Sequence, residues 1–129
     1  MKRFGILITV LSLSLGLFAQ EQHGRRSPAE RAQMRTKMMT NKLKLTETQI
    51  PKVEAINLAF AQAADSIRKN VSDRTQKKAQ LSALESDTNA KMQTVLTHDQ
   101  YTEYLKMVEM QKQKMQERQK RKPQPEEEE

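Results

Sequence analysis

A five-residue pattern, Leu-Thr-x-x-Gln, occurs twice in this chain of 129 residues, at 45–49 and 96–100. A Thr followed three residues later by Gln is typical of a capping box. In that motif the Thr hydroxyl accepts from the Gln backbone N–H, and the Gln side chain accepts from the Thr backbone N–H. Two copies therefore predict two related helix starts in one small fold.

The Leu before each Thr stands where a hydrophobic staple places it, and the expected partners are Ile50 and Tyr101. A staple fixes the angle at which the chain enters the helix. We therefore interpret the two motifs as structural helix caps and not as a binding site. The residues assigned this role are Leu45, Thr46, Gln49, Leu96, Thr97 and Gln100.

Composition favours a single all-α domain. The chain has three Gly, none of them beyond Gly24, and aromatic residues make up 4% of it. Few residues are therefore available for hairpin turns or for strands. Charged residues make up 30% of the chain, in long windows rich in Lys, Gln, Glu and Arg, as in amphipathic helices. We expect about four helices, two of them long and antiparallel.

The positions of caps and apolar residues set the expected helix boundaries. Ser27, Pro28 and Glu30 predict a start for a first helix over 28–43. The further helices are expected over 46–70, from Ser72 or Asp73 to about residue 95, and over 97–121. The residues expected to face the core in the first and last of these helices are Met34, Met38, Met39, Leu43, Tyr101, Tyr104, Leu105, Val108 and Met115.

Pro51 conflicts with the helix that the first motif predicts. If Thr46 is the N-cap, Pro51 is the fifth helical residue, where it has no N–H to donate and its ring crowds the Glu47 carbonyl. We therefore expect a kink at Pro51 or a frayed first turn.

The N-terminus is typical of a secretory signal peptide. Lys2 and Arg3 precede an apolar run over 4–18, which is short for a membrane span. We predict a cleavable signal peptide over 1–19 and a disordered segment over 20–27; the alternative is an uncleaved anchor. Either alternative predicts export, and in a Gram-negative bacterium the destination would be the periplasm. The chain has no Cys, so neither a lipoprotein attachment site nor a disulfide framework is expected.

The chain resembles the Spy/CpxP family of periplasmic proteins. The residues that carry the resemblance are those of the two L-T-x-x-Q motifs, in an all-helical chain behind a signal peptide. The resemblance implies a flat helical protomer, with the helical domain over 28–122, that pairs into a cradle-shaped homodimer. It also implies an ATP-independent chaperone that binds unfolded or misfolded envelope proteins. The alternative is an envelope-stress or metal-responsive regulator that binds a membrane sensor.

The client-binding surface that we predict is a basic, Met-containing row on the first helix, and its members are Arg31, Arg35, Met38 and Lys42. Flexible thioethers can adapt to varied apolar clients, and the cations would attract acidic ones. Such a row is also what a solvated helix flank looks like, so both interpretations remain open.

The segment over 123–129 is predicted to be a disordered acidic tail containing Glu126–Glu129, directly beyond a basic cluster that begins at Lys112. Residues 20–125 hold 21 basic and 12 acidic side chains, so the body is strongly basic. The tail is either a solubilising extension or a segment that competes with clients for the basic surface.

Other function classes find little support. His23 and His98 are the only histidines and no Cys is present, so neither a catalytic constellation nor a zinc site is expected, and no cofactor is implied. The pairs Met34/Met38 and Met107/Met110 share helix faces and could bind Cu(I), although Met also fills cores. Basic residues are spread widely and aromatic residues are few, so we do not expect nucleic-acid binding.

Overall fold

The computed structural model describes residues 25–121, and this part of the chain is all-α, as predicted. It forms four helices: α1 (Pro28–Leu43), α2 (Gln49–Asn70), α3 (Arg74–Val95) and α4 (His98–Lys120). Three of them have nearly equal lengths, since α2 and α3 contain 22 residues each and α4 contains 23. The predicted signal peptide, most of the predicted disordered segment and the acidic tail lie outside the described residues.

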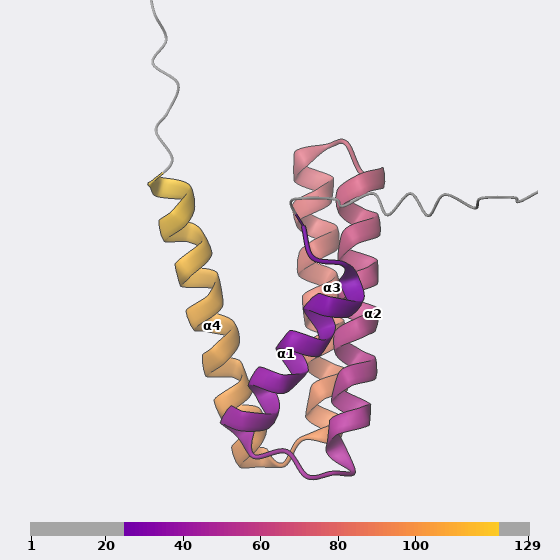
Figure 1. The fold of residues 1–129 in the computed structure, drawn as a ribbon. Coiled ribbons are helices and arrows are strands. Elements are labelled where there is room, and N and C mark those ends of the chain that lie inside the picture. Colours follow the sequence, from indigo (N-terminus) through magenta and orange to yellow (C-terminus); the bar gives the residue numbers. More distant parts are fainter. Residues whose placement is uncertain (1–24, 122–129) are drawn as a thin grey trace, which may run out of the picture.

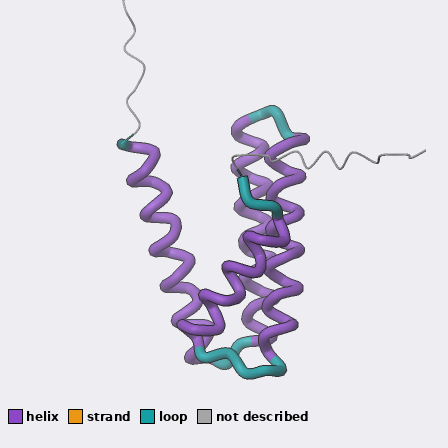
Figure 2. Tube along the Cα trace, in the orientation of Figure 1, coloured by secondary structure: helices purple, strands orange, loops and turns teal. Residues whose placement is uncertain are grey.

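The helices form a V (Figure 1). Helices α2 and α3 are an antiparallel hairpin that makes one arm, and α1 packs along α2. Helix α4 makes the other arm: it meets α1 and α3 at the vertex and diverges from them towards its C-terminal end. The vertex contains both L-T-x-x-Q junctions, whose loops lie side by side in Figure 2.

Local capping explains where three of the helices begin. Ser27 and Glu30 form a complete capping box at α1, and Thr97 and Gln100 form one at α4, as predicted. The Asp73 carboxylate accepts from the backbone N–H of Gln76, at 2.6 Å, and caps α3. Each side-chain acceptor satisfies a backbone N–H that the first helical turn leaves without a partner.

Helix α2 begins later than predicted, at Gln49 instead of Thr46, and Pro51 explains the difference. The Thr46 hydroxyl still accepts from the Gln49 N–H and the Gln49 side chain from the Thr46 N–H, at 3.3 Å and 3.0 Å. The intervening residues form a turn, with Thr46 as the backbone acceptor for Gln49 and Ile50. Pro51 is therefore the third residue of α2, in the first turn, where a missing N–H leaves no helical bond unmade.

The apolar core lies near the vertex, where all four helices contribute to one cluster. Its buried members are Met39, Leu43, Leu45, Val53, Met92, Leu96 and Tyr104. Ile50 and Tyr101 are partly buried against this cluster, so both predicted staples place their residues at the core. Burial of these side chains fixes how the two junctions face each other.

Four residues expected in the core are exposed: Met34 and Met38 on α1, and Leu105 and Met115 on α4. Helix α1 buries Met39 and Leu43, as predicted, and buries Ala32 and Thr36 in place of Met34 and Met38. The small side chains of Ala32 and Thr36 let α1 approach Ala61 and Ala64 of α2 closely, which turns the larger Met34 and Met38 outwards.

The interface between α1 and α2 contains two buried polar residues that bind each other, Thr36 and Asn57. Asn57 is 1% exposed, and its Nδ2 donates to the Thr36 hydroxyl at 3.0 Å and contacts the Met39 sulfur at 3.5 Å. Its Oδ1 has no hydrogen-bond partner in the described part of the chain. A buried acceptor without a partner costs free energy, so Asn57 contributes more to the alignment of the two helices than to their stability.

Candidate functional site

The vertex of the V is held by a reciprocal pair of glutamines from the two motifs. Gln49 Nε2 donates to Gln100 Oε1 at 2.7 Å, and Gln100 Nε2 donates to Gln49 Oε1 at 3.1 Å. Gln49 also donates to the carbonyl of Val95, the last residue of α3, and Gln100 donates to that of Leu43, the last residue of α1. Each glutamine thus caps the start of one helix and binds the end of another.

A groove of about 540 Å³ opens between α1 and α4 beside this vertex. Residues from the second half of α1 and from most of α4 line it, so it follows the inner side of the diverging arms. The lining residues are Arg35, Met38, Met39, Lys42, Tyr104, Met107, Val108, Met110, Gln111, Lys114, Met115 and Arg118.

The lining combines thioethers with positive charge. Five of the eight methionines in the chain line the groove. Four cations also line it, Arg35 and Lys42 from α1 and Lys114 and Arg118 from α4, whereas no carboxylate does. None of these four cations forms an ion pair with another residue of the described range. The groove therefore presents adaptable apolar side chains within a positive potential.

The floor of the groove is buried and its walls are exposed. Met39 and Tyr104 are fully buried, and the Tyr104 hydroxyl donates to Asn89 Oδ1 on α3 at 2.8 Å. Burial raises the pKa of Tyr104 above its ordinary value, which keeps this donor protonated. Met110 and Met115 on α4 are 47% and 53% exposed.

Two further contacts position the walls. The Arg35 guanidinium lies 5.2 Å from the centre of the Phe60 ring, which fixes this cation on the α1 side. Lys112 Nζ lies 2.7 Å from the Glu85 carboxylate and links α4 to α3 outside the groove. The hydrogen bond and charge of Glu85 raise the pKa of Lys112.

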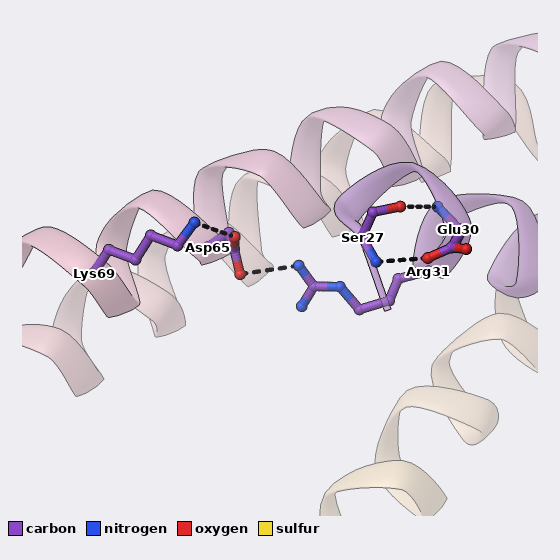
Figure 3. A network of polar contacts seen from close by, with 5 residues as sticks. All are labelled: Ser27, Glu30, Arg31, Asp65 and Lys69. Atoms are coloured by element: carbon purple, nitrogen blue, oxygen red, sulfur yellow. Dashed lines mark hydrogen bonds and ion pairs between the residues drawn. The ribbon is translucent and has the colours of Figure 1, made fainter. Parts of the chain in front are cut away.

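Three of the four residues predicted as a client-binding row lie together in this groove: Arg35, Met38 and Lys42. Arg31 does not line it. Its guanidinium lies 3.0 Å from the Asp65 carboxylate, which also pairs with Lys69 at 3.2 Å (Figure 3). The hydrogen bond from Lys69, and secondly that from Arg31, lower the pKa of Asp65. Arg31 therefore fastens α1 to α2 instead of facing a ligand.

The α4 wall was not part of the predicted site. Met107, Met110, Lys114 and Arg118 recur at intervals of three or four residues, and Met115 follows Lys114 directly, which places the group on one side of a helix. The periodicity could have indicated this wall. The sequence could not show that it faces α1, because the facing residues are more than 60 positions apart in the chain.

A family model described as a domain of unknown function, DUF4890, matches residues 19–104, which is most of the chain. The chain belongs to the DUF4890 family. Both L-T-x-x-Q motifs and the glutamine pair lie within the matched range, whereas the outer half of α4 lies beyond it. No curated protein and no solved structure matches this DUF4890 chain.

Residues 25–121 of this DUF4890 protein contain neither a metal-binding cluster nor a membrane-spanning helix. No group of three or more His, Cys, Asp and Glu side chains is placed to hold a metal ion. No helix there is long and apolar enough to cross a membrane. The groove between α1 and α4 is thus the candidate functional site.

Proposed function

We propose that this DUF4890 protein is a periplasmic, ATP-independent chaperone-like protein that binds unfolded or misfolded clients in the groove between α1 and α4. The observation that carries the proposal is the lining itself: five methionines and four cations without a carboxylate. The resemblance of the L-T-x-x-Q motifs to those of the Spy/CpxP family supports the same function. The proposal assigns no reaction and no nucleotide to the chain.

The lining suits a binding site for varied sequences. A methionine side chain has three rotatable bonds and a polarizable sulfur, so one surface can adapt to many apolar clients. Unpaired cations attract acidic segments over a distance and so speed their first encounter with the groove. Unfolded chains that expose apolar residues next to Asp or Glu are therefore the expected clients.

The proposal includes export by the predicted signal peptide and a homodimer. From Glu109 to Arg121 every residue is exposed, and the ion pair of Lys112 with Glu85 is what links this outer half of α4 to α3 in the described chain. A second copy placed against this half would cover it and enlarge the binding surface. Sedimentation velocity on the mature chain tests this part of the proposal, since a monomer at working concentration would contradict the dimer.

Suppression of client aggregation tests the function. We expect the mature protein to keep reduced, denatured α-lactalbumin in solution without nucleotide. The double variant M110S/M115S should bind this client about tenfold more weakly, because the client can no longer bury the apolar area of the two methionine side chains. M34S is the matched control, since Met34 is 49% exposed but lies outside the groove. Equal affinity of both variants would contradict the groove as the binding site.

A second candidate is a metal-responsive regulator that binds a membrane sensor. The gathering of five methionines around one groove favours it, because thioethers are ligands for Cu(I). Calorimetric titration with Cu(I) under reducing conditions tests this candidate. Binding tighter than about micromolar that is lost in M110S/M115S would support it, and no heat of binding would contradict it.

A further inference from the structure

The four cations of the groove have no anionic partner among the described residues, although the chain carries a dense group of anions nearby in sequence. Glu126–Glu129 supplies four consecutive carboxylates, five to eight residues after the last described residue, Arg121. Two of the groove cations, Lys114 and Arg118, lie on the helix that leads into this segment. The four groove cations and the four carboxylates of Glu126–Glu129 are opposite in sign and equal in number.

The distances allow the two to meet. Arg121 and Lys114 are seven residues apart on α4, or about 10 Å along the helix axis. The five residues from Arg121 to Glu126 can span up to about 17 Å, and the eight to Glu129 up to about 27 Å. Pro123 and Pro125 are residues that disfavour a continuation of α4, and a segment that returns along the helix requires such a break.

We propose that Glu126–Glu129 binds in the groove of its own chain, on Lys114 and Arg118, and thereby competes with acidic clients. This inference rests on the proposed function for its regulatory consequence, but the docking of the segment can be measured without any client. The competition would be strongest at low ionic strength, because the interaction is between exposed charges.

The lack of cysteine makes a direct test possible, since the variant E129C has one thiol for a nitroxide spin label. The label broadens methyl resonances near it, and the chain offers Met methyls inside and outside the groove. We expect the Met110 and Met115 methyl signals to lose most of their intensity at about 0.01 M salt. They should recover at about 1 M, where the Debye length falls to about 3 Å. Met34 should be unaffected, because it lies outside the groove.

Two double variants, each of which neutralises two cations, distinguish docking in the groove from attraction to the nearest cations. In the labelled chain, K114Q/R118Q should abolish the broadening and K120Q/R121Q should retain it. Lys120 and Arg121 are closer to the labelled segment but do not line the groove. The substitution of Glu126, Glu127 and Glu128 by Gln should also abolish it. Broadening that survives these Gln substitutions, or that depends on Lys120 and Arg121 alone, would overturn the inference.

Client affinity provides the regulatory measurement. Deletion of 123–129 should tighten the binding of carboxymethylated α-lactalbumin by about five- to tenfold at low salt, as expected if the segment occupies most grooves. If the intact protein binds this client and deletion changes nothing, the competition is wrong and the proposed function stands. If neither protein binds the client, the proposed function fails, and the spin-label measurement alone decides whether the segment docks.

Discussion

Gln49 and Gln100 hydrogen-bond to each other through both atoms of their side-chain amides, although they are 51 residues apart in sequence. Each amide oxygen also accepts from the backbone N–H of its own Thr, at 3.0 Å in both motifs. The Gln49 amide nitrogen also donates to the carbonyl of Val95, the last residue of α3, and that of Gln100 donates to the carbonyl of Leu43, the last residue of α1. All hydrogen-bonding positions of the two amides are thus used, which joins the starts of α2 and α4 to the ends of α1 and α3.

The first prediction concerns this pair. Gln100→Ala should lower the free energy of unfolding by about 2–3 kcal/mol, because it removes several bonds and leaves the partners of Gln100 unsatisfied. Gln49→Ala should cost a similar amount. The double variant should cost less than the sum of the two by about 1 kcal/mol, since one shared interaction is lost in both. Urea denaturation gives the free energy of unfolding of the natural chain, the two single variants and the double variant. Strictly additive losses would show that the two glutamines are not coupled.

The second prediction concerns Lys44, which follows α1 with φ 54° and is the one non-glycine residue between 25 and 121 with positive φ. A left-handed residue at a helix end is most stable as glycine, because a Cβ crowds the backbone there. Lys44→Gly should raise the free energy of unfolding by about 0.5–1 kcal/mol. Lys42→Gly, inside α1, is the control and should lower it by a similar amount.

The third prediction concerns the buried amide of Asn57. Asn57→Leu should raise the free energy of unfolding by about 1 kcal/mol, because a buried acceptor without a partner is replaced by an apolar side chain with the same branching at Cγ. Thr36 keeps its bond to the Ala32 carbonyl, at 2.9 Å. Asn57→Asp should instead destabilise the fold by several kcal/mol at neutral pH. A loss of stability in Asn57→Leu would mean that the amide contributes more than its alignment of α1 and α2.

The fourth prediction concerns acid stability. The pKa of Asp65 is lowered from its ordinary value of 3.8 by hydrogen bonds from Lys69 and Arg31. The unfolded chain therefore binds a proton at a higher pH than the folded chain does. The contribution of Asp65 is fully present above its ordinary pKa and is lost as the pH falls through the folded value. Stability measured from pH 6 to pH 2 should fall less steeply below about pH 4 in Asp65→Asn than in the natural chain.

The residues that the sequence predicted best are those that act locally. Ser27 with Glu30, and Thr97 with Gln100, place helix starts within one residue of the expected positions, because a capping box needs only four consecutive residues. The sequence showed that Pro51 conflicts with a helix that begins at Thr46. It did not show that the helix begins three residues later, at Gln49. The backbone of Thr46 made this possible by accepting from both Gln49 and Ile50.

The features that the sequence did not predict depend on which elements meet. Met38 was expected in the core, yet it is exposed and lines the groove because Ala32 and Thr36 face α2 in its place. Three residues of the α1 wall, Arg35, Met38 and Lys42, belong to the row that the sequence suggested, whereas no residue of the α4 wall does. No periodicity within α4 shows that Lys114 and Arg118 face the same groove as Arg35. The hydrogen bonds between Gln49 and Gln100 could not be predicted either, because they depend on two helix starts meeting in space.

The divergence of α4 from a fixed vertex gives the molecule the geometry of a lever. Arg118 is 18 residues from Gln100, or about 27 Å along the helix, and every described residue from Glu109 onwards is exposed. A tilt of about 10° at the glutamine pair therefore displaces Arg118 by about 5 Å, roughly one helical turn. Small changes at the junction are thus amplified into large changes of aperture, and the width available to an occupant is determined at a glutamine pair that does not line the groove.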